Sequence, residues 1–417
     1  MYQRFKANHH PHLAIWLRSA NRRPGIPLGS FSHLLASQHS KMSTETIAAL
    51  PAQHVPIVDF ATLTDSNELG SLIEAAYGPK GLGIMAVANV PGLEELRMKL
   101  LPLAFRFANL PADVKTKYEL EKAYYSFGWS HGKENLQGKP DYSKGSFYDN
   151  PLHNVKTDDA QLIKEFPTFY HDNIWPTEEI PELEDAFMKL GQLIVSTGLL
   201  VAKQCDKYVE SQCPTYEAGK LYRIIKESRS CVGRLLHYFA MAAADLEKRD
   251  VSSESVEAEF SSWCGWHNDH SALTGLVQAL FTDMSGATID NPDPSAGLYI
   301  KNRDGQIVRA LIPKGHLVYQ IGETSQILTG GILQATPHAV RGPQVPNVNR
   351  ETMAVFMGPE HNEPMYIPEG MSPESAGQTA NLPLGVPPLL SRWDNSMVFH
   401  QFTKKTLDAY YDLSKSP

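Results

Sequence analysis

The stretch that decides the fold runs from Trp266 to His270 and reads WHNDH, with a histidine and an aspartate two positions apart. Residues two apart on a β-strand, or at its frayed end, point to the same side, so His267 and Asp269 can share one metal ion. A further histidine, His338, follows 71 positions after His267, which leaves room for several strands to run out and back. Two histidines and one carboxylate are the donor set of a mononuclear non-haem Fe(II) site, which leaves one face of the ion open.

A candidate anion-binding pair stands 12 positions after His338, at Arg350 and Thr352. On a strand these two side chains share a face, and a guanidinium with a hydroxyl is suited to hold a carboxylate. Arg341, three positions after His338, is a competing source of the cation. We favour Arg350 because a β-rich apolar run follows it and would fix its direction. The order of these residues predicts an enzyme that binds iron and an acidic co-substrate side by side.

Several segments match a known family, in the family's own order. They are VPIVDF (55–60), RLLHYF (234–239), WHNDHSALTGLVQ (266–278), GLYIKNRDGQ (297–306), LVYQIGETSQILTGG (317–331), TPHAVR (336–341) and RETMAVFMGP (350–359). With these segments the chain resembles the Fe(II)/2-oxoglutarate-dependent dioxygenases, specifically the isopenicillin-N-synthase-like branch. The resemblance covers most of the chain after about residue 54.

The resemblance implies a mostly β fold with flanking helices. Its core would be a double-stranded β-helix (a jelly roll, cupin-like), and its N-terminal region would be α/β. It also implies Fe(II), 2-oxoglutarate as co-substrate and O2. The implied metal ligands are His267, Asp269 and His338; the implied 2-oxoglutarate contacts are Arg350, Thr352 and Tyr238. No catalytic residue is expected beyond the ligands.

The activity implied by the resemblance is an oxygenase that releases succinate and CO2 while hydroxylating or desaturating a small organic substrate. A 2-oxoglutarate-independent Fe(II) oxidase of the isopenicillin N synthase type is an alternative, because its arginine and hydroxyl pair holds a carboxylate of the substrate. A non-catalytic jelly-roll binding protein is a second alternative, against which the intact ligand triad argues.

Three departures from the family pattern stand out. Asn268 occupies the middle of the ligand triplet, where the family often has Thr or another small residue. Thr352 takes the last place of R-x-S and keeps the hydroxyl. The gap from His338 to Arg350 is longer than usual, through PQVPNVN (343–349). The first two should leave the chemistry intact, whereas the third is what makes Arg341 a competitor.

The charge and composition of the chain limit the kinds of partner that it is expected to bind. A net charge of −8 over 417 residues offers no general attraction to nucleic acid or to an anionic membrane. No uninterrupted apolar stretch approaches the length that would span a bilayer. The four cysteines form no C-x-x-C pair, so they suggest neither a disulfide framework nor a zinc site. We expect them to be the reduced thiols of an intracellular protein. We therefore expect a small-molecule substrate and neither nucleic acid nor a membrane as partner; the sequence leaves the oligomeric state open.

The chain divides by pattern into a basic N-terminal tail (1–42), an N-terminal dioxygenase region (43–224), the jelly-roll core (225–360) and a C-terminal extension (361–417). Helical spacing predicts helices over 93–110, about 181–208 and about 402–413. The helix over 181–208 should brace the outside of a sheet. The interval 124–154 is rich in Gly, Tyr and Ser with little periodicity, which predicts a long ordered loop.

The N-terminal tail has an unusual charge pattern. Residues 1–43 contain six basic side chains and no Asp or Glu, a composition typical of an organellar transit peptide. A disordered tail, or an upstream extension with translation beginning at Met42, fits equally well. We expect a cytoplasmic location, with a mitochondrial or other organellar address through residues 1–41 as the alternative.

Overall fold

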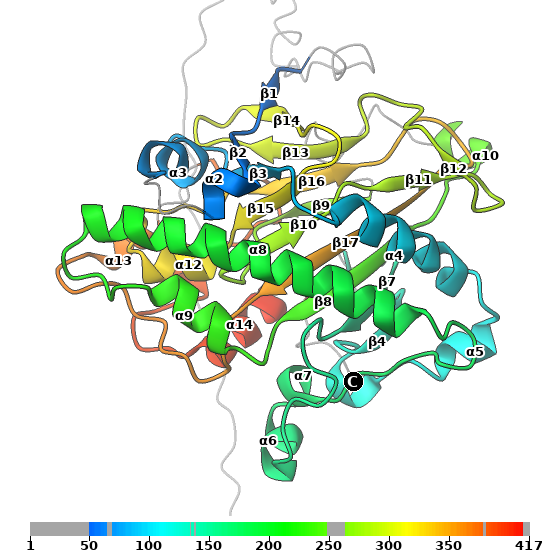
Figure 1. Ribbon diagram of the computed structural model, residues 1–417, viewed down its shortest axis with the longest axis horizontal. Coiled ribbons are helices and arrows are strands. Elements are labelled where there is room, and N and C mark those ends of the chain that lie inside the picture. Colours follow the sequence, from blue (N-terminus) through cyan, green and yellow to red (C-terminus); the bar gives the residue numbers. More distant parts are fainter. Residues whose placement is uncertain are drawn as a thin grey trace, which may run out of the picture. The chain divides into compact units, whose positions relative to one another are not determined.

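The computed structural model describes residues 50–64, 69–133, 135–136, 139–247, 263–377 and 381–411. The predictions for the basic tail fall outside these residues. Two sheets dominate the fold, and strands from the N-terminal region take part in both (Figure 1).

The smaller sheet has five strands. Their order is β1 (Ala52–His54), β14 (Ile307–Leu311), β13 (Gly297–Lys301), β16 (His338–Arg341) and β9 (Cys264–His267). The larger sheet runs β2 (Ile57–Asp59), β3 (Ile84–Ala88), β15 (Leu317–Ile321), β10 (Leu273–Leu276), β17 (Asn349–Met357), β8 (Val232–Tyr238), β7 (Lys144–Asp149) and β4 (Gly128–His131). Two short strands, β11 (Leu280–Thr282) and β12 (Thr288–Ile289), pair beside β17.

The two sheets face each other across a shared interior. Ile84 and Val318 of the larger sheet pack with Ile300 of the smaller one. Farther along, Tyr238 of β8 packs with Val340 of β16. Because side chains alternate across a strand, each strand of such a sandwich sends every second residue inward. This confirms the predicted jelly-roll core.

The outer face of the larger sheet is covered by helices (Figure 1). The longest is α8 (Leu183–Gln212), which occupies the place predicted for the bracing helix, and α4 (Leu93–Ala108) lies beside it. Their apolar sides share one core with Met353 and Val355 of β17. Glu184 and Asp185 stand in the first turn of α8, where acidic side chains favour a helix.

Helix α8 is also long and apolar enough to cross a membrane by length and composition alone, although charged residues such as Lys189 and Lys203 interrupt its apolar sequence. More than half of its most apolar window is buried within the protein. Packing against the sheet accounts for that apolar character, as in a core helix.

The interval 124–154 is not a loop, contrary to the prediction. Its strands β4 and β7 extend the larger sheet beyond β8. The register places Trp129 opposite Phe147, and both rings pack on Phe107 of α4. A Cβ atom on Gly145 would come within 2.1 Å of the Trp129 ring, so the ring fits there because this residue has no side chain.

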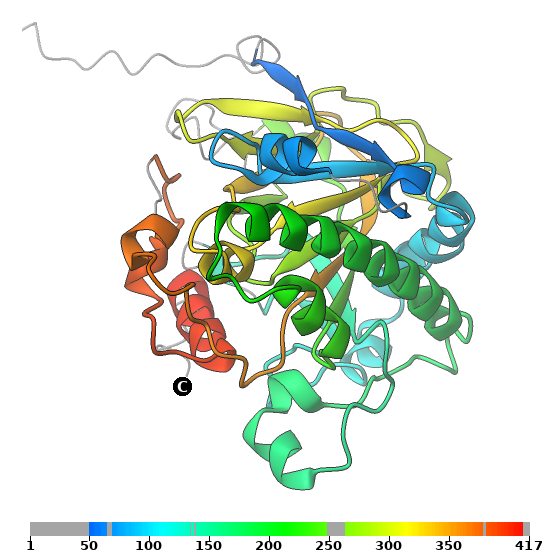
Figure 2. The ribbon, with the colours of Figure 1, turned by 60° about the vertical axis from the view of Figure 1, so that its left-hand side comes forward.

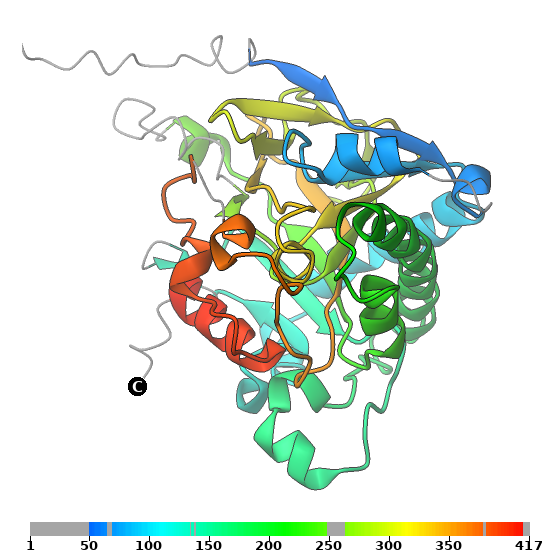
Figure 3. The same cartoon turned by 90° about the vertical axis from the view of Figure 1, so that its left-hand side faces the viewer.

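The C-terminal segment forms a small layer of its own. It contains α13 (Pro373–Ala376), the 3-10 turn η2 (Leu389–Ser391) and α14 (Phe399–Tyr411), so the predicted last helix begins three residues early. Trp393 and Phe402 pack there on Ile327 of the short helix α12 (Glu323–Leu328). Figures 2 and 3 show this orange and red segment beside α12.

The remaining short elements are α2 (Phe60–Thr64), α3 (Gly70–Tyr77), α5 (Ala112–Thr116), η1 (Glu121–Ala123), β5 (Asn135–Leu136), β6 (Lys139–Pro140), α6 (Ala160–Glu165), α7 (Pro167–Tyr170), α9 (Lys220–Glu227) and α10 (Ala243–Glu247).

Candidate metal centre

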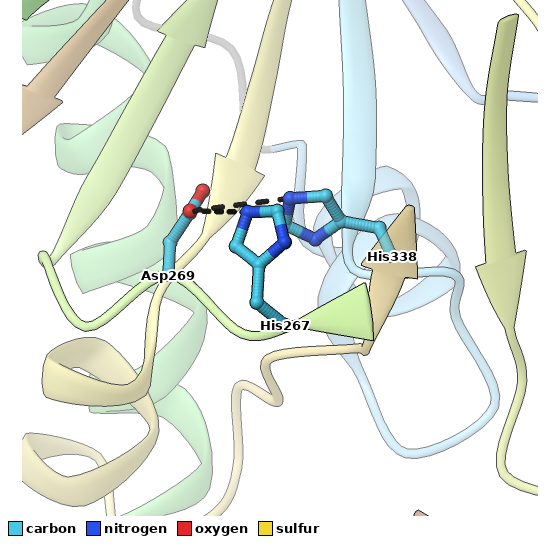
Figure 4. Close-up of side chains that lie close together, drawn as sticks. All are labelled: His267, Asp269 and His338. Atoms are coloured by element: carbon cyan, nitrogen blue, oxygen red, sulfur yellow. Dashed lines mark ion pairs between the residues drawn. The ribbon is translucent and has the colours of Figure 1, made fainter. Parts of the chain in front are cut away.

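The structure brings together the three side chains that the sequence singled out as metal ligands (Figure 4). His267 is the last residue of β9, and His338 is the first of β16 and its antiparallel partner. Asp269 follows β9 by two residues. Its Oδ1 lies 3.6 Å from His267 Nε2 and 3.9 Å from His338 Nε2. All three ligand atoms lie within 4.8 Å of one another, and no other such group occurs in the described part of the chain.

Backbone carbonyl groups orient both imidazole rings. His267 Nδ1 lies 2.7 Å from the carbonyl oxygen of Gly265, and His338 Nδ1 lies 3.3 Å from that of Thr336. A carbonyl can only accept, so in each ring Nδ1 carries the donated proton and the neutral ring keeps its lone pair on Nε2. The two Nε2 atoms are the ones that face Asp269, as a shared ion requires.

The electrostatics of the trio differ from one ligand to the next. Burial lowers the pKa of His338 to about 4, which keeps that ring neutral. Burial also acts to lower the pKa of His267, but the Cys264 sulfur and the Asp269 carboxylate outweigh it and raise that pKa to about 9. Asp269 and His338 are buried. In the metal-free pocket the His338 ring is therefore neutral, whereas a cation that binds at His267 Nε2 would have to displace a proton.

Arg350 lies on the inner face of the larger sheet, directly opposite Tyr238 in the β17–β8 ladder. Its guanidinium carbon is 4.9 Å from the centre of the Tyr238 ring. Its Nη1 atom is buried and has no hydrogen-bond partner among the described residues. A buried guanidinium nitrogen without an acceptor is costly, so this position suits an anion brought by a ligand. Thr352 shares the face, and its hydroxyl donates to the Val277 carbonyl at 3.1 Å.

The same register shows that Arg350 and the ligand strand face one interior. His338 pairs with Ile300, whose side chain packs between the sheets. Val340, two residues on from His338, packs against Tyr238. Residues opposite each other in a ladder point to the same side, so His338, Tyr238 and Arg350 all face inward.

Arg341, the competing cation, points the other way. Its neighbour Val340 pairs with Leu298 and faces inward. Arg341 pairs with Gly297 and, because successive side chains alternate, lies on the outer face of the smaller sheet. There its Nη1 donates to the Ser295 hydroxyl and lies 3.8 Å from Asp293 Oδ2. Both partners belong to the loop before β13. This placement favours Arg350 as the residue for the co-substrate.

A buried pair on the outer face fixes the strand register. Glu351 stands opposite His237, and its Oε1 lies 3.0 Å from His237 Nδ1 and accepts from the Thr282 hydroxyl at 3.0 Å. A one-residue slip of β17 against β8 would break these bonds and turn Arg350 outward. No sequence signal pointed to this pair, because its members are 114 positions apart.

Further polar residues line the inner face next to the trio, and the sequence reasoning missed them. Arg234 of β8 donates from Nε to the Ser146 hydroxyl at 2.9 Å and lies over the Tyr148 ring. Lys144 of β7 forms a buried ion pair with Asp141. Burial acts to raise the pKa of Cys264, but the neighbouring His267 ring and, less strongly, the positive charges of Lys144 and Arg234 outweigh it and lower that pKa to about 7. Lys144 and Ser146 were missed because β7 was predicted to be a loop. Arg234 belongs to the quoted segment RLLHYF, but the sequence indicated no role for it.

The residues present fit an Fe(II) ion with 2-oxoglutarate. The donor set is the one that such iron sites use, and it closes only one side of an ion. The partnerless Arg350 nitrogen supplies a separate place for a carboxylate. Tyr238 stands directly opposite Arg350 in the ladder, and Thr352 lies two residues further along the same strand as Arg350.

Comparison with known proteins agrees with the geometry. The profile described as "non-haem dioxygenase in morphine synthesis N-terminal" matches residues 55–178, and the profile of the 2OG-Fe(II) oxygenase superfamily matches residues 265–359. The second range contains all three candidate ligands and Arg350.

Curated relatives and solved structures are similar over most of the chain. A probable iron/ascorbate oxidoreductase of Dictyostelium discoideum is 24% identical over 71% of this chain and 79% of its own length. A 2-oxoglutarate-dependent dioxygenase of Dothideomycetidae sp. is 21% identical over 76% of this chain and 78% of its own. A putative 2OG-Fe(II) oxygenase family protein from Caulobacter crescentus superimposes with a TM-score of 0.57 at 20% identity, covering 85% of this chain and 98% of that one.

A full-length Neurospora crassa protein, solved in complex with alpha-KG and 5-formyluracil, superimposes with a TM-score of 0.59 at 17% identity, covering 86% of this chain and 96% of that one. At these identities the structural likeness shows the fold. The two matched profiles, the jelly roll and the assembled triad together place the chain in the 2OG-Fe(II) oxygenase superfamily, as a 2-oxoglutarate- and iron-dependent dioxygenase.

Proposed function

We propose that this dioxygenase uses His267, Asp269 and His338 to hold Fe(II), and Arg350 with Thr352 and Tyr238 to hold 2-oxoglutarate, while it hydroxylates or desaturates a small organic molecule. The proposal rests on one observation: the metal-binding trio and the Arg350 guanidinium face the same interior from opposite sheets. A two-histidine, one-carboxylate trio lies on one sheet edge, and a buried guanidinium nitrogen without a partner among the described residues lies on the facing sheet.

Each residue has a defined task. The metal supplies, when bound, the redox chemistry that activates O2 and couples it to decarboxylation of the co-substrate. Gly265 and Thr336 hold the two rings so that both Nε2 atoms face Asp269. Arg350 offers two parallel N–H donors, and a guanidinium matches a carboxylate better than a point charge does. Its cation also lies against the Tyr238 ring, which fixes its direction.

The proposal extends to the substrate only at the level of size. Known proteins of this fold bind compounds such as 5-formyluracil, and the structure named JOX2, solved with 2OG, Fe and JA, has a TM-score of 0.52 at 17% identity and covers 86% of this chain and 87% of that one. Leu236 and Tyr238 of β8 pack with Cys264. Ser146 and Arg234 share that inner face of β7 and β8. We infer that the substrate lies there, between these strands and the metal.

Coupled turnover tests the proposed function. Protein loaded with Fe(II) and given 2-oxoglutarate and O2 is expected to form succinate in an amount equal to the O2 consumed. Succinate formation should stop when Fe(II), 2-oxoglutarate or O2 is left out. O2 consumption with a substrate but without any succinate would instead indicate the 2-oxoglutarate-independent oxidase. Absence of iron binding would leave the binding-protein alternative.

We also propose that residues 1–41 have no part in catalysis. None of them lies in either matched range, and every residue assigned to the site lies between Tyr238 and Thr352. Protein beginning at Met42 is expected to keep wild-type turnover. A fluorescent fusion of residues 1–50 should enter an organelle if the tail is a transit peptide, and a diffuse cytosolic signal would remove that interpretation. Loss of turnover in the truncated enzyme would contradict the catalytic half of the proposal.

A further inference from the structure

Helix α12 is fastened to the segment that carries Asp269. The backbone N–H of Glu323 donates to the Asp269 carbonyl at 2.8 Å, and that of Gly322 donates to the Ala272 carbonyl at 3.1 Å. The Thr324 hydroxyl donates to the carbonyl oxygen of His270 at 2.6 Å. A Cβ atom on Gly322 would stand 1.8 Å from the carbonyl oxygen of Ser271, so the two backbones touch. The position of α12 thus sets the position of the ligand segment.

The first residue of α12 carries a buried charge whose partner comes from the C-terminal segment. Glu323 and Arg392 are 1% and 2% exposed, and they form two parallel hydrogen bonds at 2.7 Å and 2.9 Å. The same guanidinium donates to the Thr406 hydroxyl of α14 at 2.8 Å. A bidentate pair of this kind allows little freedom of orientation, so it locks α12 to the C-terminal segment.

Asn268, the residue between the ligands His267 and Asp269, is held from both ends. Its side-chain amide donates to Glu323 Oε1 at 3.2 Å. Its backbone N–H donates to the Tyr410 hydroxyl of α14 at 3.0 Å. The departure of Asn268 from the family pattern therefore has a structural role, because Thr could not reach Glu323 with an amide donor.

From these contacts we infer that Arg392 and Tyr410 are positioning residues for the metal centre. Arg392 acts through Glu323 and Asn268, and Tyr410 acts on the Asn268 backbone. Together they hold His267 and Asp269 at the spacing that a shared ion needs. Both residues lie beyond the range matched by the oxygenase profile, which ends at residue 359. The inference rests on the proposed function in so far as this trio binds a metal.

Binding of Co(II) to the metal-free full-length protein tests the inference without any turnover. Tyr410→Phe removes one hydroxyl and nothing else. The double variant Glu323→Met with Arg392→Met removes both charges at similar volume, a replacement that buried pairs often tolerate. Loss of an outer-shell contact typically weakens metal binding about 10–100-fold. We expect a loss of about tenfold for Tyr410→Phe and a larger one for the double variant, with a changed visible spectrum of bound Co(II).

Lys404→Met is the matched control. Lys404 lies on the same helix α14, where its ammonium pairs with Asp408 at 2.7 Å on the surface, away from the ligand segment. It should leave Co(II) affinity and spectrum unchanged. A purely structural role for Arg392 and Tyr410 would lower the unfolding temperature of the metal-free protein but leave Co(II) affinity close to that of wild type, and that result would overturn the inference. Should the double variant fail to fold, Tyr410→Phe decides by itself. Wild-type protein that binds no Co(II) would overturn the proposed metal centre and the inference with it.

Discussion

Replacing His267, Asp269 or His338 by alanine is expected to abolish turnover while the protein stays folded. Each change removes one of three donors, and the remaining two should hold Fe(II) poorly. The loss in metal affinity should exceed the roughly 10–100-fold cost of disturbing an outer-shell partner. Asp269→Glu should also be impaired, because an extra methylene moves the carboxylate away from the two Nε2 atoms that it now faces at 3.6 Å and 3.9 Å. Bound iron per chain and succinate formation measure the effect.

His316→Ala is the matched control for these variants. His316 bonds to the carbonyl oxygen of Lys314 within its own turn and has no part in the ligand group. It should retain iron and turnover. If any of the three ligand variants kept wild-type iron content and activity, the assignment of the metal centre would be wrong.

Arg350→Ala is expected to weaken 2-oxoglutarate binding by about two to three and a half decades. The distal carboxylate would lose its partner in a partly desolvated pocket, and breaking such a pair costs about 3–5 kcal/mol, which converts to that change in affinity. Iron affinity should change little, because Arg350 is not a ligand. Arg350→Lys should recover only part of the loss, since an ammonium cannot reproduce the guanidinium fork. The dissociation constant of 2-oxoglutarate for the metal-loaded protein measures the effect.

Arg341→Ala is the internal control for this prediction. It should lower the free energy of unfolding, because Asp293 loses a partner on the outer face, but it should leave the affinity for 2-oxoglutarate nearly unchanged. A large effect of Arg341→Ala on that affinity, together with a small effect of Arg350→Ala, would reverse the assignment. If neither variant changed the affinity, the co-substrate would have to bind elsewhere.

The sequence predicts the features that repeat locally or follow a family pattern. The long helix over the sheet was predictable because helical spacing is a local signal, and the jelly roll was predictable because the chain resembles a family that has this fold. So was the approach of His267, Asp269 and His338, which rests on an ordered motif. The preference for Arg350 over Arg341 also came from the sequence. The structural reason for this preference is visible only in the strand register, which turns Arg350 into the interior and Arg341 toward Asp293.

What the sequence could not predict depends on contacts between distant residues. Strands β4 and β7 looked like a loop because Gly128 and Gly145 interrupt the alternation, yet pairing with β8 stabilises them. Glu323 and Arg392 are 69 positions apart, in segments where each charge taken alone resembles a surface residue. Only the folded chain shows that both are buried, that they pair with each other, and that Glu323 also contacts Asn268 in the ligand segment.

The most direct test of the central claim, that one interior holds iron and 2-oxoglutarate side by side, is an anaerobic absorption titration. Protein loaded with Fe(II) should show a visible metal-to-ligand charge-transfer band when 2-oxoglutarate is added, and the band should saturate at one equivalent. His316→Ala should give the same band, and Arg350→Ala should require far more 2-oxoglutarate to reach it. Iron-loaded wild-type protein that shows no band at any 2-oxoglutarate concentration would contradict the account.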